Sequence, residues 1–280
     1  MRRRWQRALA FLTLAGLALT LWCYGIAVSA PVVRRASIAI LPLGTPPLRA
    51  VLLSDIHVAG PDMPPERLAR IVAQVNALAP DIVLIAGDFV GDGYLQRRIP
   101  PAEAVRPFAA LRARLGTWAV LGNHDHWNDP SAIRIALAAS NVRLLTNQAA
   151  QVGPLALGGL DDDFTGRADL AATLARMRGL SGTRLILSHS PDPFADTPAD
   201  VPLFLAGHTH CGQLRFPLVG ALTYEIRNGA RFGCGEVNEE GRRLIVSAGL
   251  GTSVLPFRLG AVPDLWLIEL RPVPAPVPPR

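Results

Sequence analysis

The 280-residue sequence predicts a layered α/β domain preceded by one membrane-spanning helix. Three observations predict this arrangement. Residues 8–30 form a 23-residue run without a charged side chain. From residue 49 onward, apolar segments of strand length alternate with amphipathic segments of helical period, which is typical of α/β proteins. The later apolar segments are separated mostly by loops, which indicates a second sheet of mixed strand direction.

The uncharged run near the N-terminus predicts a membrane anchor. At ~1.5 Å per residue it spans a hydrocarbon core ~30 Å thick. A cleaved signal peptide is the alternative, because AVSA (residues 27–30) resembles a cleavage site. The apolar region of a signal peptide is usually only ~7–15 residues long, however, and Pro31 would hinder cleavage. RRRW (residues 2–5) is similar to part of a twin-arginine export signal, but the rest of that motif is missing. We therefore expect an uncleaved anchor.

The distribution of charge orients this anchor and argues against a nucleic-acid partner. The net charge is +6, but seven of the 28 basic residues, all arginines, precede Asp55, the first acidic residue. The other 21 basic residues face 22 acidic ones, so the rest of the chain is near neutral and no specific nucleic acid is expected. Four arginines precede the anchor and two follow it closely. The positive-inside rule then places the main domain on the periplasmic, extracytoplasmic side of the inner membrane.

Composition divides the chain into four parts. Residues 1–30 are expected to form the anchor, and residues 31–48 a proline-bearing link with one strand around Ser37–Leu41. Residues 49–270 form the folded domain. Residues 271–280 are rich in proline and are expected to be extended or disordered.

The folded domain is predicted to begin with three strands, in RAVLLSDIHV, DIVLIAGDFV and TWAVLGNHDHW. A helix is expected in PPERLARIVAQVNALAP, where Pro65 suits the first turn and Pro80 ends the helix. Further helices are expected over 102–114, over 131–140 with Asp129 or Ser131 as the cap and Asn141 at the end, and over Ala168–Met177. Later strands are expected at Leu155–Leu160, Arg184–Ser188, Val201–Ala206, Leu244–Ala248 and Leu265–Leu270.

Five of the six histidines stand directly after apolar segments, together with Asp and Asn side chains. These residues are Asp55 and His57, Asp88, Asn123 with His124 and Asp125, His189, and His208 with His210. Residues just past a strand end lie on the rim of a sheet, where loops carry function. One such pair alone would suggest surface histidines, but scattered surface histidines would not repeat this placement. We therefore expect the side chains to meet in one site.

The residue types indicate the chemistry of this site. Asp, Asn and His without cysteine suit Mn, Fe or Zn. They are more ligands than one ion needs, so two divalent ions are expected. A carboxylate can bridge two cations, and ions ~3.5–4 Å apart can clamp both ends of a phosphoryl displacement. A water bound to such cations is acidified and becomes the nucleophile.

Five motifs in this order, SDIH, AGDFV, GNHD, SHSPD and GHTH, resemble the calcineurin-like metallophosphoesterase superfamily from about Val51 to Leu250. The resemblance implies a four-layer αββα sandwich with two mixed β-sheets. The longer forms GHTHCGQ and SAGLGTSVLPFR are similar to a bacterial, often membrane-associated branch. That branch includes exported phosphodiesterases and a UDP-2,3-diacylglucosamine pyrophosphatase of lipid A synthesis.

The resemblance also implies a role for each site residue. One metal would be held by Asp55, His57, Asp88 and His210, and the other by Asp88, Asn123, His189 and His208, with Asp88 as the bridge. His124 would not bind metal but would protonate the leaving oxygen or stabilise charge beside the phosphate. Asp125 would orient the His124 imidazole.

Other residues carry weaker expectations. Gly91 stands where purple acid phosphatases have a tyrosine, so no Fe–tyrosinate site is expected. His126 matches no ligand position and is expected to be an ordinary loop residue. GGLDDDFTGR resembles an acidic loop of the same branch, in which Asp162 and Arg167 are candidates for binding substrate; the alternative is a solvated loop leading into a helix.

The cysteines leave two interpretations open. Cys211 and Cys234 could pair in an oxidising compartment or remain buried free thiols, and a neutral packed thiol is our default expectation for Cys211. Cys23 lies in the anchor, and no C-x-x-C spacing exists.

Together these features predict a membrane-anchored, two-metal phosphoesterase that hydrolyses a phosphodiester or pyrophosphate bond. The anchor favours a lipid-linked or envelope substrate, such as one similar to UDP-2,3-diacylglucosamine. One alternative is a metal-dependent nuclease or nucleotide phosphodiesterase, although a nuclease would need a basic track. The other is a non-catalytic interaction module, but relatives of that kind typically lose ligand histidines, and this chain keeps them all.

Overall fold

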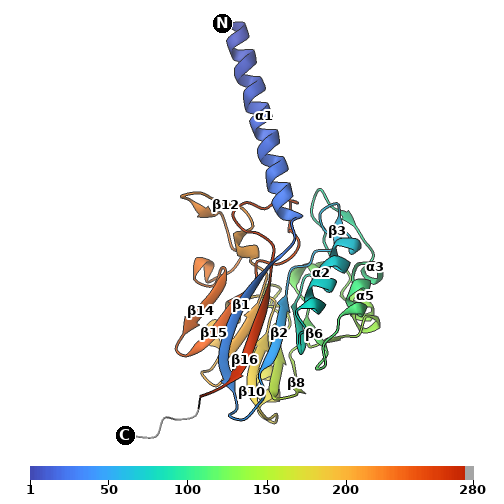
Figure 1. Ribbon diagram of the computed structural model, residues 1–280, viewed down its shortest axis with the longest axis vertical. Coiled ribbons are helices and arrows are strands. Elements are labelled where there is room, and N and C mark those ends of the chain that lie inside the picture. Colours follow the sequence, from blue (N-terminus) through green and yellow to red (C-terminus); the bar gives the residue numbers. More distant parts are fainter. Residues whose placement is uncertain (275–280) are drawn as a thin grey trace.

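A single long helix projects from a layered domain in the computed structural model, which describes residues 1–274 (Figure 1). This helix, α1 (Arg2–Ala27), is long and apolar enough to cross a membrane, and only 6% of its most apolar window is buried. Its last turn packs on the domain through Cys23 and Ala27, which are both buried. The described C-terminal residues lie at the opposite end of the domain from α1 (Figure 1).

The first sheet contains six strands and is mixed. In spatial order they are β1 (Val32–Leu41), β16 (Asp264–Pro272), β2 (Leu48–Leu53), β4 (Ile82–Ala86), β6 (Thr117–Val120) and β7 (Val142–Leu144). Strands β2, β4, β6 and β7 run parallel, whereas β16 is antiparallel to β2 and parallel to β1.

The second sheet also contains six strands, as the later apolar segments predicted in part. In spatial order they are β14 (Gly235–Glu239), β15 (Arg242–Val246), β11 (Leu203–Ala206), β10 (Thr183–Leu187), β9 (Leu155–Gly159) and β8 (Gln148–Val152). The four central strands are parallel, and each edge strand is antiparallel to its neighbour. Two short ribbons complete the strands: β3 (Ala59–Gly60) with β5 (Arg97–Arg98), and β12 (Arg215–Phe216) with β13 (Gly220–Ala221).

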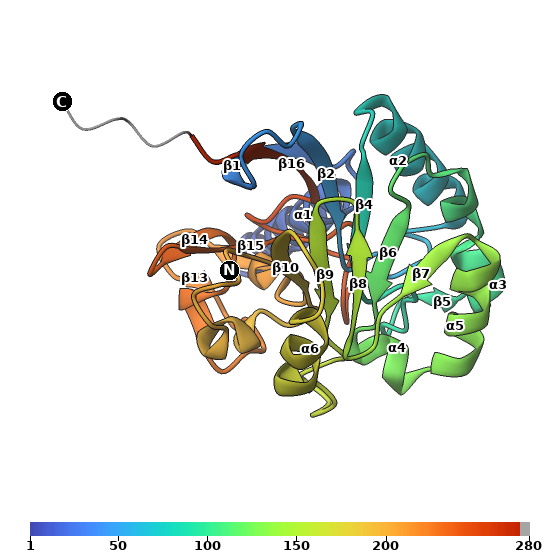
Figure 2. The same ribbon diagram turned by 90° about the horizontal axis from the view of Figure 1, so that it is seen from below.

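Helices cover the outer faces of both sheets (Figure 2). The α-helices of the domain are α2 (Pro65–Ala77), α3 (Pro101–Ala104), α4 (Asn123–Trp127), α5 (Pro130–Ala139) and α6 (Leu170–Met177). Short 3₁₀ turns lie at η1 (Arg106–Ala110), η2 (Asp192–Asp196), η3 (His210–Gly212) and η4 (Gly229–Arg231). The Asp129 side chain caps α5 by accepting from the Ala132 N–H, as one of the two expected caps.

Three apolar clusters hold the layers together. Alternate residues of the first sheet, such as Val83 and Leu84, face opposite sides, toward α2 and α5 on one side and toward the second sheet on the other. The outer face of the second sheet packs on α6 and η2, where Phe204 meets Phe194. This order of layers confirms the predicted αββα sandwich with two mixed sheets and an N-terminal apolar helix.

Two expected elements differ from the structure. The strand expected around Ser37–Leu41 begins earlier, at Val32, because β1 pairs along its length with β16; most of the expected link is therefore sheet. The helix expected over 102–114 is instead α3 followed by η1, because Pro107 lacks the N–H that would continue an α-helix. In the expected tail, residues 271–272 end β16, and residues 275–280 lie outside the described part of the chain.

Candidate metal centre and active site

Seven donor side chains meet at one end of the two sheets, and all are buried. In the first sheet Asp55 and His57 follow β2, Asp88 follows β4 and Asn123 follows β6; in the second, His189 follows β10, and His208 and His210 follow β11. Parallel strands present their carboxyl ends at the same edge of a sheet, and loops beyond that edge form binding sites. The topology therefore brings together residues separated by up to 155 positions, from Asp55 to His210.

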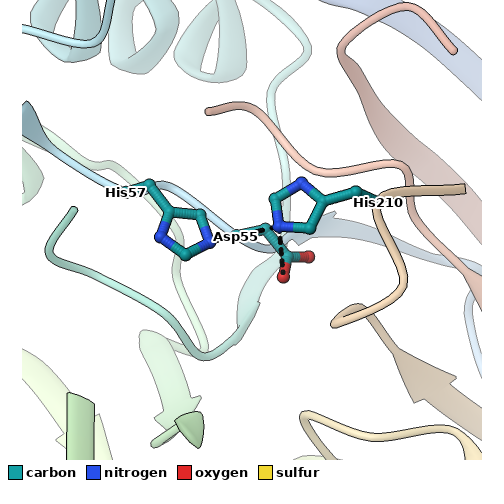
Figure 3. Close-up of side chains that lie close together, drawn as sticks. All are labelled: Asp55, His57 and His210. Carbon is teal, nitrogen blue, oxygen red and sulfur yellow. Dashed lines mark hydrogen bonds and ion pairs between the residues drawn. The ribbon is translucent and has the colours of Figure 1, made fainter. Parts of the chain in front are cut away.

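Asp55, His57 and His210 form one group, and their side chains lie close together (Figure 3). Nε2 of His57 lies 3.1 Å from Nε2 of His210, which lies 3.6 Å from Oδ1 of Asp55. Oδ2 of Asp88 lies 3.4 Å from Nε2 of His57. These four side chains are the first ligand set that the resemblance implies.

Asp88 also belongs to a second group, with Asn123, His189 and His208. Nε2 of His189 lies 3.3 Å from Oδ2 of Asp88 and 2.9 Å from Oδ1 of Asn123. Nδ1 of His208 lies 3.1 Å from Nε2 of His189 and 3.0 Å from Oδ1 of Asn123. One oxygen, Oδ2 of Asp88, thus faces both groups, which is the position of a bridging ligand.

Backbone carbonyls fix the orientation of two of these imidazoles. Nδ1 of His189 donates to the carbonyl of Ala86 at 2.7 Å, and Nε2 of His208 donates to the carbonyl of Glu225 at 3.1 Å. The other ring nitrogen of each histidine, Nε2 of His189 and Nδ1 of His208, faces the centre. Metal-binding histidines commonly use their second nitrogen in this way.

Five of the seven donors adopt a left-handed backbone, which is uncommon for residues other than glycine. The φ angles are 49° at Asp55, 46° at His57, 57° at Asp88, 70° at His208 and 49° at His210. Such conformations cost ~1–3 kcal/mol each and persist where the surrounding fold imposes them, often at functional sites. The loops are therefore shaped to present these side chains rather than to relax the chain.

Two glycines leave room for the central carboxylates. A Cβ atom at Gly122 would collide with Oδ1 of Asp88, and one at Gly207 would collide with Oδ2 of Asp55. Each glycine directly precedes a donor, Asn123 in one case and His208 in the other. The glycines in GNHD and GHTH are therefore required by close packing around the site.

Burial and charge act differently on different donors. Burial alone would lower the pKa of His189, but the carboxylate of Asp88 outweighs it and raises that pKa well above its usual range, and burial raises the pKa of Asp55 to about 6. The other histidines and Asp88 are set to forms that bind cations. Burial lowers the pKa of His57 to about 3 and that of His208 to about 4, and it lowers the pKa of His210 well below its usual range. Burial alone would raise the pKa of Asp88, but neighbouring imidazoles, above all His189, outweigh it and hold that pKa well below its usual range. Neutral imidazoles and an ionised carboxylate are the forms that bind divalent metals. The donor set fits a pair of divalent ions.

His124 lies beside the donors and lines the adjoining pocket. Its Nδ1 donates to Oδ1 of Asp92 at 2.6 Å, and its Nε2 lies 3.2 Å from Oγ of Ser253. Burial lowers the pKa of His124, but the carboxylates of Asp88 and Asp92 outweigh burial and raise it above its ordinary value. A ligand position is also within reach, because atoms of His124, His57 and Asp88 lie within 4.8 Å of one another.

The structure corrects the role expected for Asp125. Its carboxylate accepts from the N–H groups of Asp88 at 2.9 Å, Phe89 at 2.8 Å and Gly122 at 2.9 Å, and so ties the loops after β4 and β6 together. Asp125 stands at the third position of α4, from which its side chain turns back to the helix start. The partner of His124 is instead Asp92, which we did not predict. The sequence signal that could have pointed to Asp92 is its position four residues after Asp88.

His126 is more than an ordinary loop residue. It lies in α4, and its Nε2 is 2.7 Å from Oδ1 of Asp161. This contact joins the loop after β6 to the acidic loop after β9. The neighbouring Asp162 is also buried. One oxygen of Asp162 accepts from the Thr165 N–H, and the other has no hydrogen-bond partner among residues 1–274.

Arg167 and Asp162 do not belong to the pocket lining formed by the described residues. Arg167 is exposed, and its N–H donates to the carbonyl of Asp162 while its own carbonyl accepts from Asn147. From the same loop Phe164 reaches the pocket instead. The expectation that Arg167 or Asp162 binds substrate gains no support from this placement.

Cys211 and Cys234 form a disulfide, so the default expectation of a free thiol at Cys211 is wrong. The pairing is sterically simple because the two Cα atoms lie 4.7 Å apart. Cys211 directly follows His210, and the disulfide therefore ties a donor-bearing turn to the segment before β14.

Arg258 supports the site from behind. It is fully buried, and its Nη2 donates to the carbonyls of Ala248 at 2.7 Å and Gly251 at 2.6 Å. The same nitrogen lies 3.3 Å from Nδ1 of His210. The sequence pattern gave no sign of this role, because a lone arginine is ordinarily exposed.

A pocket of about 320 Å³ opens beside the donors. Its polar end is formed by Asp88, Asn123, His124, His208 and His210. Its remaining wall is largely apolar and aromatic, with Trp127, Phe164, Leu214, Leu222, Tyr224 and Val254. A ligand in this pocket would place a polar group at the donors and apolar atoms against the wall.

The family of the chain follows from a sequence comparison. The model of the Metallophos family, described as calcineurin-like phosphoesterase, matches residues 48–212. This range is more than half of the chain and contains all seven donors. This chain belongs to the calcineurin-like phosphoesterase family.

Curated relatives agree with this membership. The chain is 32% identical over 254 residues to a "Transmembrane protein with metallophosphoesterase domain" of Bos taurus, and the match covers 84% of this chain and 55% of that protein. It is 28% identical over 243 residues to the "Uncharacterized metallophosphoesterase YkuE" of Bacillus subtilis, covering 83% and 82%. The chain thus spans about half the length of the bovine relative.

Among solved structures, a 5'-nucleotidase precursor from Thermus thermophilus is similar in fold, with 16% sequence identity and a TM-score of 0.43. The match covers 80% of this chain and 55% of that chain.

Proposed function

We propose that this calcineurin-like phosphoesterase is a membrane-anchored, two-metal enzyme that hydrolyses a phosphodiester or pyrophosphate bond of a lipid-linked or envelope substrate. The observation that carries the proposal is the position of Asp88, whose Oδ2 faces both donor groups. Asp55, His57, Asp88 and His210 would hold one ion, and Asp88, Asn123, His189 and His208 the other. When bound, the ion pair supplies charge that acidifies water and neutralises phosphoryl oxygens.

The protein's own residues complete the reaction. His124 lines the pocket, with Nδ1 held by Asp92 at 2.6 Å and Nε2 3.2 Å from Oγ of Ser253, another lining residue. A protonated imidazole in this position can donate a proton to the leaving oxygen as the bond to phosphorus breaks. Asp125 keeps the loops of Asp88 and Asn123 in register through its three backbone contacts.

The shape of the pocket supports a substrate with an apolar portion. Trp127, Phe164 and Leu222 line the wall and are 55%, 44% and 69% exposed. A phosphoester at the donors would leave its apolar part against these side chains. UDP-2,3-diacylglucosamine, an acylated sugar joined to a nucleoside through a pyrophosphate, represents this substrate class.

Two alternatives differ from the proposal in what they require. A nuclease would need a basic track for the nucleic-acid backbone, whereas the chain after Arg49 carries 21 basic and 22 acidic residues. A non-catalytic module would have no need for strained donor loops, yet five of the seven donors are in a left-handed conformation.

The test is a substrate and metal screen of the full chain in detergent. Metal-stripped protein is supplied separately with Mn²⁺, Zn²⁺, Fe²⁺ or Mg²⁺ and offered a nitrophenyl phosphomonoester, a bis-nitrophenyl phosphodiester, a nucleoside diphosphate-linked lipid and a DNA oligonucleotide. We expect metal-dependent hydrolysis of the diester and of the pyrophosphate lipid, and none by an Asp88→Asn control. Preference for the oligonucleotide would support the nuclease, and inactivity with every metal would support the non-catalytic module.

A further inference from the structure

Exposed apolar side chains gather around the foot of α1, on the same end of the domain as the pocket. They are Tyr94, Leu95, Leu218, Val219, Leu222 and Val254, here called the rim. Tyr94 is 87% exposed, Leu218 108% and Val219 72%. Scattered exposed apolar residues are ordinary on a protein surface, but a connected group marks an interaction site.

Hydrogen bonds show that the rim is connected. The N–H of Tyr94 donates to the carbonyl of Val254 at 3.1 Å. The side chain of Gln213, at the base of the β12–β13 hairpin, donates to the carbonyls of Ser253 and Leu255 at 2.9 and 3.0 Å. The loop 91–96, the segment 253–255 and the hairpin therefore form one surface.

The same surface is fastened to the end of α1. The N–H of Arg258 donates to the carbonyl of Cys23 at 3.0 Å, and Nη2 of Arg67 donates to the carbonyl of Ser29 at 2.9 Å. Figure 1 shows the β12 hairpin and β3 on either side of the foot of α1. These contacts fix the position of the rim along the axis of α1.

The length of α1 places the rim at the edge of a bilayer. The uncharged part of the helix runs from Ala8 to Ala27, and ~20 residues are needed to cross a hydrocarbon core ~30 Å thick. Trp5 and Trp22, near the two ends, are 74% and 68% exposed, and tryptophan favours membrane interfaces. The hydrocarbon core of the bilayer therefore ends close to the last turn of α1, which contacts the domain. No spacer separates the rim from the membrane.

Charge near the rim agrees with a lipid surface. Arg97 and Arg98 of β5 are exposed, and β5 pairs with β3, which leads into Asp62. The carbonyl of Asp62 accepts from Arg67, the residue that also contacts Ser29 at the foot of α1. Arginine beside apolar side chains is typical of surfaces that lie in a bilayer interface, where phosphate headgroups meet acyl chains.

We infer that the rim is a second membrane-contact surface, which seats the mouth of the pocket on the bilayer from which α1 emerges. Leu222 and Val254 belong both to the rim and to the wall of the pocket. An acylated substrate could then pass from the membrane along these side chains to the donors without crossing water. The membrane contact stands on α1 and the rim alone; the passage of substrate rests on the proposed function.

The contact is tested with an environment-sensitive fluorophore at position 218. The full chain carries Cys23→Ala and Leu218→Cys, is labelled at the new thiol, and is reconstituted into vesicles of phosphatidylcholine and phosphatidylglycerol. The matched control carries the label at Leu43→Cys. Leu43 is 63% exposed in the turn between β1 and β2, and β1 runs away from the foot of α1 (Figure 1).

We expect a blue-shifted emission at position 218, quenched by nitroxides on lipid acyl chains, and a water-like emission at position 43 that these nitroxides leave unchanged. Water-like emission at both positions would overturn the inference. So would a blue shift at 218 that lipid nitroxides do not quench, because a second protein or a second copy of this chain would then cover the rim.

A kinetic arm separates this inference from the proposed function. Leu218→Asp should raise the apparent KM for a vesicle-embedded phosphoester lipid about tenfold, the equivalent of one leucine side chain lost from an apolar contact. Leu43→Asp should not. Turnover of the water-soluble bis-nitrophenyl phosphodiester should stay unchanged in both variants. If the unaltered chain hydrolyses none of these substrates, the proposed function fails while the fluorescence still decides the membrane contact.

Discussion

Among single residues, His124 has a role that can be separated from metal binding. Its Nδ1 is engaged by Asp92, which leaves Nε2, 3.2 Å from Oγ of the pocket residue Ser253, as the nitrogen available to a substrate. If it protonates the leaving oxygen, His124→Ala should lower turnover of a phosphodiester with a poor leaving group by ~10²–10⁴-fold. A nitrophenyl diester needs little protonation and should lose much less. Steady-state kinetics with both substrates, together with elemental analysis, measure this difference.

The variant Asp92→Asn is the matched test of how His124 is held. It should show the same dependence on the leaving group, with a smaller loss of turnover for the substrate with the poor leaving group. We expect a loss of ~10–100-fold, as is typical when the hydrogen-bond partner of a site residue is removed. Equal losses for both substrates would favour electrostatic stabilisation of the phosphoryl oxygens instead. Loss of an ion from His124→Ala would mean that His124 is a ligand.

Asp88 differs from the other donors because it faces both groups. Asp88→Ala should therefore lose both ions, whereas His210→Ala should mainly weaken the ion held with Asp55 and His57. Ions per chain, counted by elemental analysis after dialysis against a weak chelator, check the prediction. Two ions retained in Asp88→Ala would contradict the bridging assignment.

The donor set could be predicted at the residue scale because its members share a residue type and a place after apolar segments. The supporting residues could not. Asp92 lies in a loop whose course depends on packing, and Asp125 points back at its own helix start rather than at His124. Arg258 reaches the site only because the fold buries it under Ala248 and Gly251.

At the level of elements, the segment 248–261 depends on Arg258. Its fully buried guanidinium holds carbonyls that face away from water. Arg258→Met would leave them without donors and should cost ~3 kcal/mol of unfolding free energy, since each unsatisfied buried group costs ~1–3 kcal/mol. Denaturant unfolding of the full chain in detergent measures this.

Arg243→Met on β15 is the control for that substitution. The Arg243 side chain is 37% exposed and pairs with Glu236 at 2.6 Å, and such surface pairs contribute only ~0–1 kcal/mol. Equal stability of the two variants would show that the buried contacts of Arg258 do not stabilise the segment.

The elements that the sequence predicted best are those with a strong apolar pattern and a clear end. The helix starting at Pro65 and the strands leading to Asp55, Asp88 and His208 are examples. Strand β8 has the sequence QAAQV, which carries no alternation of apolar and polar residues, and β14 has GEVNE with one apolar residue. Both are edge strands, which pair through their backbone with one neighbour, so their side chains carried little signal.

For the whole molecule, the two-sheet sandwich places the donor side chains, the disulfide and the foot of α1 at one end. His210 is adjacent to Cys211, which is bonded to Cys234, and Arg258 contacts both His210 and the carbonyl of Cys23. The arrangement connects the site to α1 through neighbouring residues. No local sequence pattern reports such proximity, because it arises from strand order.

The orientation of the molecule in the membrane is the last prediction. Four arginines precede the uncharged run and two follow it closely, which favours a cytoplasmic N-terminus and an extracytoplasmic domain. The disulfide supports the same side, because cytosolic thiols are kept reduced. Alkaline phosphatase fused after Arg49 should therefore be active and sediment with membranes, whereas a fusion after Arg7 should be inactive.

In the full chain taken from cells under acid quench, Cys211 and Cys234 should resist alkylation until a reductant is added. Replacing Arg2, Arg3 and Arg4 by Ser leaves one arginine before the run and two after it, which reverses the asymmetry and should lower the activity of the Arg49 fusion. An inactive Arg49 fusion, with Cys211 and Cys234 alkylated without reductant, would place the domain in the cytoplasm.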